Sequence, residues 1–405
     1  MTDQTARRGS GRKRVLVRVG IVVSALAGWL WSGTSLALVI TFIQITNSGG
    51  CSHSPSINKD GSQVAFLSDG NLTGNNADGN SEIFVWKRAT GSFVQVTNST
   101  GCCNDIPAIS AKNNRIAFVS DLDLIAGSNS DGSNELFLWD PKSGLKQLTT
   151  DSSGNCCIDR VRISGDGKRI AFASSQDLTG NNAAGTEEIF LWDDKTGLTQ
   201  LTHSTGAYSY SPDISSDAIR VAFVSSADLV GNNADGNEEI FLWEDGNGFT
   251  QITNTTGGSN SLPVINAEGK RIAFVSSADL VGSNADGNTQ LFLWDNKAGV
   301  IQVTNAKSED TVTDPAINAY GNRVAFASNA DLVGSNPDGN FEIFLWDRDI
   351  GISQITNTAN GAEETIDNGE PTIDKKGDVI AFTVERNDFS VERTDQEIVV
   401  ADIKE

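Results

Sequence analysis

The sequence predicts an all-β protein, a seven-bladed β-propeller of four-stranded blades. Three observations support this fold class. Six tryptophans recur every 51 to 53 residues, at Trp86, Trp139, Trp192, Trp243, Trp294 and Trp346. Around them one pattern of four short β-branched or aromatic runs is repeated, each bounded by Gly, Asn or Asp, as strands are. Gly is also abundant, with 40 residues, as expected of a turn-dense β-protein.

The four runs, named A to D in chain order, are clearest in the fourth repeat: SPDIS (211–215), RVAFVSS (220–226), EEIFLWE (238–244) and FTQITN (249–254). Seven A–B–C sets begin near Ser54, Ile106, Arg160, Ser211, Leu262, Asp314 and Glu370. A first D run (41–47) precedes the first A run, and the chain ends on a C run (396–403). We expect that D run to complete the last sheet, which would close the ring and leave no free edge there.

Residues 1–37 are expected to be a signal peptide or membrane anchor, and residues 38–405 the propeller. A basic start is followed by an apolar run over about 19–39, the order found in secretory signals. Ser35 and Ala37 place small residues where a signal peptidase cuts, so we favour cleavage after Ala37 and a secreted, periplasmic or cell-surface protein. The apolar run is also long enough to remain as a membrane tether.

The chain is strongly acidic, with a net charge of −22. Six basic residues but one acidic residue fall within 1–37, so the remainder is more acidic still. Such a surface repels nucleic acid and anionic lipid. It is suited to cations, basic partners or a salty medium, or simply keeps an exported protein soluble.

The repeats resemble those of a known family. The segments SPSINKDGSQVAFLS, VRISGDGKRIAFAS and SEIFVWKRATGSFVQVT are similar to the WD40-like repeats of TolB-type propellers. The resemblance covers nearly all of residues 41–403 and implies the propeller fold. It is not specific for function, because one fold serves many roles. The long Asn/Asp/Gly loop between runs B and C departs from the family pattern.

In an up-and-down blade the B–C and D–A connections share one face, and the short A–B and C–D turns share the other. We expect function on the B–C/D–A face, where the first residue of each A run faces the central channel. Arg160 and Arg162 could there oppose Asp314 and Glu370. With Tyr208 and Tyr210 beside them, these residues form a candidate site for a small polar ligand or a peptide. The alternative is a solvated channel mouth.

The B–C loops are candidate calcium sites, because Asx residues at alternate positions can supply oxygen ligands. The candidate ligands are Asn76, Asp78, Asn80 and Glu82 in the first repeat, Asn233, Asp235, Asn237 and Glu239 in the fourth, and Asn336, Asp338, Asn340 and Glu342 in the sixth. The fifth repeat has Asn284, Asp286, Asn288 and Gln290, and the third replaces two of the four with Ala184 and Thr186. Asn, Asp and Gly also form self-hydrogen-bonded turns without any metal.

The five cysteines lie in three consecutive D–A loops. In an exported protein we expect disulfides between neighbouring blades, Cys51–Cys102 and Cys103–Cys156, with Cys157 unpaired. Vicinal bridges, Cys102–Cys103 and Cys156–Cys157, are the alternative, since connectivity cannot be deduced from sequence.

Catalytic signatures are scarce. The chain has two histidines, His53 and His203, in different repeats, and no Gly-x-Ser-x-Gly elbow or phosphate loop. We therefore expect a monomeric binding scaffold for a protein or small polar ligand, and assign no catalytic residue. One alternative is a carbohydrate- or peptide-processing enzyme that uses the channel-mouth carboxylates and arginine. Another is a calcium-stiffened surface protein.

Overall fold

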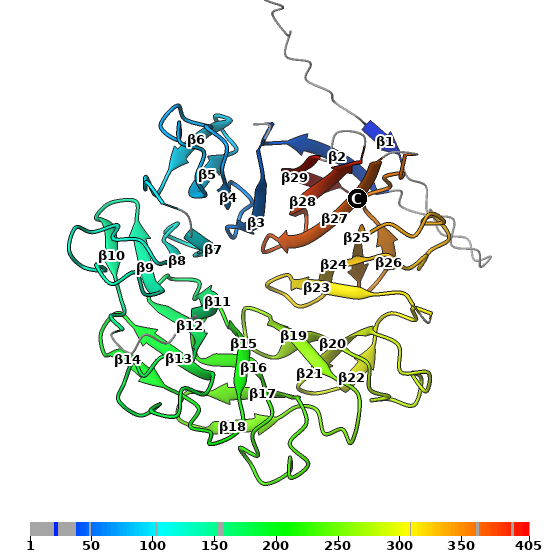
Figure 1. Ribbon diagram of the computed structural model, residues 1–405. Helices are drawn as coiled ribbons and strands as arrows, with labels where there is room; N and C mark the ends of the chain where they lie inside the picture. The colour runs from blue at the N-terminus through cyan, green and yellow to red at the C-terminus, as the bar shows by residue number, and fades with distance from the viewer. Residues whose placement is uncertain are drawn as a thin grey trace, which may run out of the picture.

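The computed structural model of the protein describes residues 20–22, 38–47, 50–101, 104–151, 158–307, 309–361, 364–389 and 393–404. They form seven antiparallel β-sheets arranged as blades around a central axis (Figure 1). The predicted seven-bladed propeller is confirmed. Among the described residues, none forms a helix with the length and apolar character needed to cross a membrane.

The first three blades follow the predicted A–B–C–D order from the centre outward. Blade 1 contains β3 (Ser52–Ile57), β4 (Gln63–Ser68), β5 (Glu82–Lys87) and β6 (Ser92–Gln95). Blade 2 contains β7 (Asn104–Ile109), β8 (Ile116–Ser120), β9 (Glu135–Asp140) and β10 (Gly144–Gln147). Blade 3 contains β11 (Ile158–Ile163), β12 (Arg169–Ser174), β13 (Glu188–Asp193) and β14 (Gly197–Gln200).

The next three blades repeat this design. Blade 4 contains β15 (Ser209–Ile214), β16 (Arg220–Ser225), β17 (Glu239–Glu244) and β18 (Gly248–Gln251). Blade 5 contains β19 (Asn260–Ile265), β20 (Arg271–Ser276), β21 (Gln290–Asp295) and β22 (Gly299–Gln302). Blade 6 contains β23 (Val312–Ile317), β24 (Arg323–Ser328), β25 (Glu342–Asp347) and β26 (Gly351–Gln354).

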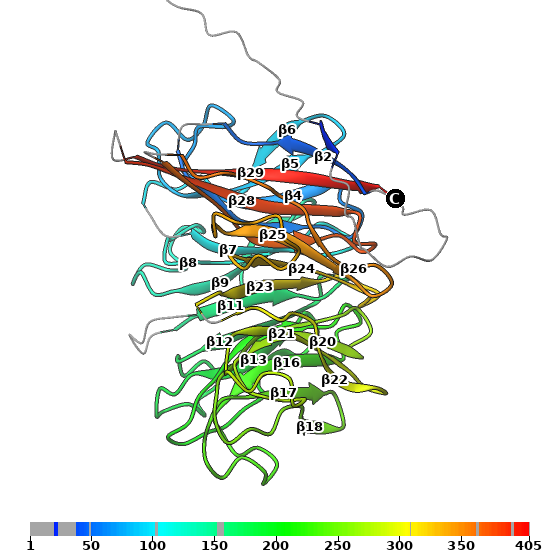
Figure 2. The same ribbon diagram turned by 90° about the vertical axis from the view of Figure 1, so that its right-hand side faces the viewer.

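Blade 7 combines both parts of the chain and closes the ring as predicted. It contains β27 (Glu364–Ile373), β28 (Val379–Asp388), β29 (Arg393–Lys404) and the N-terminal β2 (Val39–Gln44), with β1 (Gly20–Val22) beyond β2. Strand β2 pairs with β29 over six residues, from Val39 opposite Lys404 to Gln44 opposite Val399. An ion pair between Arg88 and Asp402 also links blade 1 to blade 7. Strands β28 and β29 run farther than their counterparts elsewhere (Figure 2).

A stacked pair of phenylalanines lies at the middle of the B and C strands. In blade 4 these are Phe223 and Phe241, both without exposed surface, with ring centroids 5.9 Å apart. Both belong to the cluster that joins blade 4 to blade 3, along with Trp243. The aromatic repeats are therefore packing between blades, as expected for sheets that are covered on both faces.

An arginine at the start of strand B clamps each of blades 2 to 6 to the next blade. In blade 6, Nε of Arg323 lies 2.6 Å from Oδ2 of Asp347 in the same blade, and Nη1 lies 2.9 Å from Oδ1 of Asp378 in blade 7. The arginine stem packs on Gly377, where an added Cβ would lie 2.5 Å from Cδ of Arg323. The equivalent arginines are Arg115, Arg169, Arg220 and Arg271.

Arg323→Ala is expected to lower the free energy of unfolding by about 3 kcal/mol, because it leaves the buried Asp347 carboxylate without its partner. Urea denaturation at neutral pH measures this loss. Arg220→Ala is the matched control, since its guanidinium makes the same clamp with a side chain 21% exposed, against 10% for Arg323. A loss for Arg323→Ala no larger than that of the control would contradict the role given to this buried pair.

Candidate functional site

Each A strand carries a β-bulge, where its pairing with strand B shifts register. The residue there has a positive φ in six blades, between 46° and 52°, at Ser54, Arg160, Ser211, Leu262, Asp314 and Glu370. In blade 3 the A–B pairing shifts between Asp159 and Arg162. A left-handed conformation costs a non-glycine residue roughly 1–3 kcal/mol. The bulge occurs with serine and leucine as well as with charged residues, so it is a feature of the propeller fold. The residue type at the bulge decides which chemical group is placed there.

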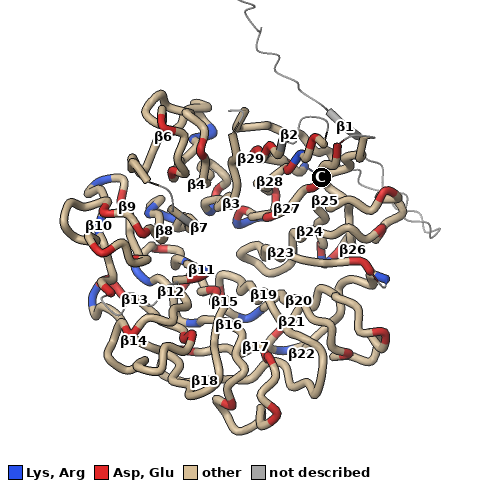
Figure 3. The backbone as a smooth tube through the Cα atoms, viewed as in Figure 1, with Lys and Arg blue, Asp and Glu red and all other residues tan. Residues whose placement is uncertain are grey.

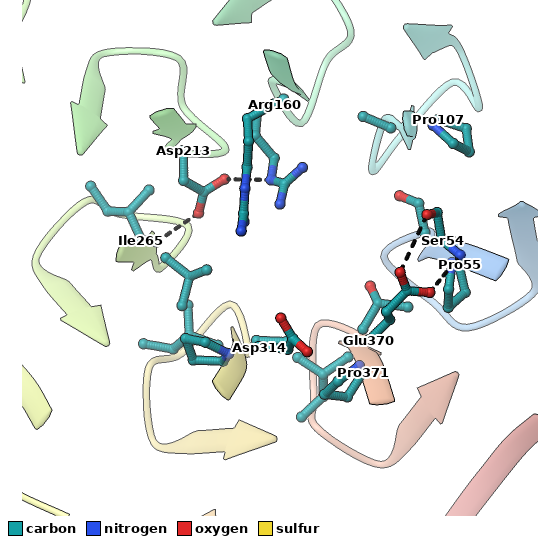
Figure 4. Close-up of a pocket in the computed structure, with 18 of the residues that line it drawn as sticks. Ser54, Pro55, Pro107, Arg160, Asp213, Ile265, Asp314, Glu370 and Pro371 are labelled. Carbon is teal, nitrogen blue, oxygen red and sulfur yellow. Dashed lines mark hydrogen bonds and ion pairs between the residues drawn. The ribbon is translucent and has the colours of Figure 1, made fainter. Parts of the chain in front are cut away.

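The bulges surround a cavity of about 400 Å³, here named the loop-side cavity. Four of the predicted site residues line it: Arg160, Arg162, Asp314 and Glu370. Figure 4 shows Arg160 on one wall, with Asp314 and Glu370 on the other side of the opening. The predicted opposition of arginine and carboxylates at the channel mouth is thus present. Tyr208 and Tyr210 do not line the cavity.

The Glu370 carboxylate is engaged in closing the inner ring. Its Oε2 accepts hydrogen bonds from the Ser54 backbone N–H at 2.7 Å and from the Thr383 hydroxyl at 2.8 Å. Ser54 belongs to blade 1, and Glu370 and Thr383 to blade 7. Glu370 therefore contributes charge to the cavity while its oxygens hold the first and last blades together (Figure 4).

Arg162 and Asp213 form the second charged pair of the wall. Nε of Arg162 lies 3.5 Å from Oδ1 of Asp213, whose Oδ2 accepts the Ile265 N–H at 2.7 Å. Burial raises the pKa of Asp213, and the nearby Arg162 acts in the opposite direction. This carboxylate therefore joins three consecutive blades.

The Arg160 guanidinium differs from the other charged groups of the cavity. No hydrogen bond or ion pair joins it to another described residue. Its pKa is lowered by burial and by Arg162, whereas Asp159, Asp314 and Asp213 act against this shift. Burial also raises the pKa of Asp314, with Arg160 lowering it and Glu370 raising it. Arg160 is thus a partly desolvated cation that is free to bind an anion.

A second titratable cluster lies beside the cavity, between blades 3 and 4. Burial and the Asp159 carboxylate raise the pKa of Glu187 to about 7. Burial and the Glu238 carboxylate raise the pKa of Tyr210, whose ring lies 6.0 Å from that of Tyr208. The predicted tyrosines are therefore part of an acidic group at the cavity rim.

The long B–C loop is held by hydrogen bonds within itself and to the D–A loop. In blade 4, the Asn233 amide donates to the Asn237 carbonyl at 2.9 Å, and the Asn237 amide donates to Glu239 Oε1 at 3.0 Å. Glu239 Oε1 also accepts from the Thr255 backbone N–H and hydroxyl, at 2.5 and 2.7 Å. Glu239 Oε2 accepts from Asn260 of the next blade at 3.2 Å. Donors therefore surround the buried carboxylate.

The four predicted calcium ligands of each loop differ in exposure. The Asn and Glu positions are buried or half-buried, but Asp78, Asp235 and Asp338 are exposed at the loop tips. In blade 5 the neutral Gln290 accepts the equivalent bonds from Thr304 and Ala306. Across the described ranges, no group of three or more His, Cys, Asp or Glu could hold a metal ion.

Some amide oxygens of these loops nevertheless lack a partner among the described residues. They are Oδ1 of Asn76 and Asn80 in blade 1, Asn233 and Asn237 in blade 4, and Asn336 and Asn340 in blade 6. In blade 2 the Ser133 hydroxyl donates to the equivalent oxygen, that of Asn129. Calcium binding stays a prediction, and these amide oxygens are the atoms that a cation or a water would meet.

Cys51 is a free thiol in the structure, and burial raises its pKa. Its predicted disulfide partner Cys102, along with Cys103, Cys156 and Cys157, falls outside the described residues. The disulfides therefore stay predictions.

Sequence reasoning missed Asp159, Asp213, Glu187 and Glu238. Asp213 occupies the same repeat position as Arg162, so aligning the A runs side by side would have found it. Glu187 and Glu238 precede strand C and look like ordinary surface acids until blades 3 and 4 are placed together.

Known proteins resemble the chain in structure. An oligogalacturonate lyase from Vibrio parahaemolyticus is 15% identical with a TM-score of 0.60, over 93% of this chain and 96% of that one. The β-propeller domain of the Trilobed protease from Pyrococcus furiosus is 12% identical with a TM-score of 0.54, over 86% and 95%. TolB from Acinetobacter baumannii is 18% identical with a TM-score of 0.45, over 80% and 76%.

The chain shares its propeller fold with the lyase and with the protease domain. Identities this low establish the fold alone. No protein-family model matches the chain, and no curated protein matches it in sequence.

Glu187→Gln is expected to stabilise this propeller above pH 7. The pKa of Glu187 is raised from 4.5 to about 7 in the folded state. Stability linked to its protonated form is therefore lost as the pH rises from about 4.5 through about 7. The variant removes that loss, so its free energy of unfolding at pH 8 should exceed that of the wild type by about 2 kcal/mol.

Urea denaturation between pH 4 and pH 8 measures this difference. Glu309→Gln, which alters an exposed carboxylate, is the control. Parallel pH profiles for the wild type and Glu187→Gln would show that Glu187 is not held protonated by its surroundings.

Proposed function

We propose that the protein is a binding propeller that takes a small dipolar ligand in its loop-side cavity. The observation that carries this proposal is the Arg160 guanidinium, which faces the cavity without a partner among the described residues. A buried cation without a partner is costly, and a ligand carboxylate would remove that cost through charge-assisted, two-pronged hydrogen bonds.

The opposite wall defines the other half of the ligand. Asp314 lies across the opening from Arg160 (Figure 4). Both Glu370 oxygens face Ser54, and Asp213 is paired with Arg162. Asp314 is thus the carboxylate best able to receive a cationic group. A ligand bearing a carboxylate and an amine, such as an amino acid or short peptide, could pair its carboxylate with Arg160 and its amine with Asp314.

Glycyl-lysine is a suitable probe, with glycyl-lysinamide as the matched compound without a carboxylate. We expect isothermal titration calorimetry to show binding of the first to the wild type, and at least tenfold weaker binding to Arg160→Gln. Arg348→Gln, at an exposed C–D turn, is the control and should bind like the wild type.

Loss of binding in both variants, or equal affinity for the amide, would rule out the role of Arg160. If amino acids, dipeptides and uronic acids all fail to bind, the dipolar-ligand proposal is wrong.

An enzyme that processes a carbohydrate or peptide is the second candidate, favoured by the Glu187–Asp159 pair. A carboxyl group with a pKa near 7 beside a second carboxyl group is suited to general acid–base catalysis. Asp159 lines the same cavity as Arg160, which could neutralise a substrate carboxylate. Turnover of a sugar or peptide that is abolished by Glu187→Gln would establish this candidate over a pure binding role.

We propose further that the protein is exported. The basic and apolar N-terminal segment supports this, and strand β2 begins at Val39, close to the expected cleavage site. N-terminal sequencing of the protein from the cell envelope or medium should give Leu38 as the first residue. An intact Met1 in a membrane fraction would instead indicate a retained anchor, and recovery of the protein in the cytoplasm would contradict export.

A further inference from the structure

A ring of isoleucines divides the centre of the propeller into two cavities. The last residue of every A strand is an isoleucine, namely Ile57, Ile109, Ile163, Ile214, Ile265, Ile317 and Ile373. All seven line a second cavity of about 540 Å³ on the A–B face, here named the turn-side cavity. Three of them, Ile265, Ile317 and Ile373, also line the loop-side cavity. The ring is thus a shared apolar floor.

The outer wall of the turn-side cavity is basic on one side. Lys375, Lys59 and Lys112 line it from blades 7, 1 and 2, which are consecutive around the ring. Figure 3 shows basic positions beside the ends of β3, β7 and β27 nearest the centre. Three lysines on adjacent blades are notable in a chain whose net charge is −22.

These lysines are not neutralised by the protein. No ion pair joins any of the three to another described residue, and the Lys375 ammonium lies 5.3 Å from the centroid of the exposed Tyr320 ring. The four acids that line the cavity do have partners. Asp217 lies 3.9 Å from Arg220, Glu268 lies 2.9 Å from Lys270, and Asp213 pairs with Arg162. Asp374 Oδ1 accepts three backbone N–H groups of its own turn. The three ammonium groups, which no ion pair within the described residues engages, therefore lie above an apolar floor.

We propose that the turn-side cavity binds an anionic amphiphile, a compact apolar group that carries a carboxylate. The apolar part would lie on the isoleucine floor, where each buried CH₂ is worth about 0.8 kcal/mol. The carboxylate would lie among the ammonium groups of Lys59, Lys112 and Lys375. The volume falls within the range of small-molecule sites, roughly 300–1,000 Å³.

The site is independent of the proposed function of the loop-side cavity. Its three lysines come from the A–B turns, and Arg160 and Asp314 do not line it. The two cavities share Asp213 and three residues of the isoleucine ring, Ile265, Ile317 and Ile373.

Sodium octanoate is the probe, and octylammonium chloride of the same chain length is its matched cation. Isothermal titration calorimetry on the full chain should show octanoate binding and at least tenfold weaker octylammonium binding. The variant Lys59→Gln, Lys112→Gln, Lys375→Gln should weaken octanoate binding at least tenfold.

The matched control is Lys142→Gln, Lys195→Gln, Lys297→Gln. It makes the same change in net charge at three exposed lysines of C–D turns, on the same face but outside the cavity. It should bind octanoate like the wild type. Ile317→Thr, which replaces the ethyl group of one floor residue with a hydroxyl, should weaken binding severalfold, and its thermal unfolding confirms that it is folded.

Three results would overturn the proposal. They are no octanoate binding by the wild type, equal affinities of the two triple variants, and equal affinities for octanoate and octylammonium. Arg160→Gln should leave octanoate binding unchanged. A loss in that variant would place octanoate in the loop-side cavity and would also overturn the proposal, without bearing on glycyl-lysine binding.

Discussion

A buried glutamate at the first position of strand C holds together three segments on the B–C/D–A face: the B–C loop, the D–A loop and the first strand of the next blade. In blade 4 the Glu239 carboxylate accepts from the B–C loop, the D–A loop and the first strand of the next blade. Hydrogen bonds to a charged acceptor are worth more than neutral ones. The long Asn-rich loop supplies the donors that this carboxylate needs. The bulged A strand follows directly from the D–A loop. The hydrogen bonds to the glutamate therefore also position the wall of the loop-side cavity.

The fold could be predicted from sequence because the sequence pattern of one blade recurs in every repeat. Each repeat shows the same alternation of strands and turns, and the offset D run at 41–47 revealed the closure that β2 and β29 make. The role of the B–C loop could not be decided this way. The same residues, such as Asn233 and Asn237, fit a metal site or a self-hydrogen-bonded turn equally well, and only contacts distant in sequence distinguish the two.

The candidate site was predicted in part for a related reason. Arg160, Asp314 and Glu370 stood out because they are charged at the first position of the A run, and Arg162 because it is charged at the third. Arg160 lacks an acceptor while Glu370 finds donors, and this depends on what the neighbouring blades offer, which no single repeat shows. The isoleucine ring was overlooked for the opposite reason. It is invariant among the repeats and looks like ordinary core, yet all seven isoleucines line the turn-side cavity and three of them also line the loop-side cavity.

The pairing of β2 with β29 also sets an order of events during synthesis. Strand β2 is among the first segments made, yet its partner is the last strand of the chain. At about 5–20 residues per second, β2 must wait about 20–80 s for that partner. Six blades can form in sequence meanwhile, each against the one before. The apolar strand VITFIQ is then left as an open edge, the kind of segment that aggregates or recruits a chaperone. Ring closure is therefore the step at which the newly made chain is most vulnerable.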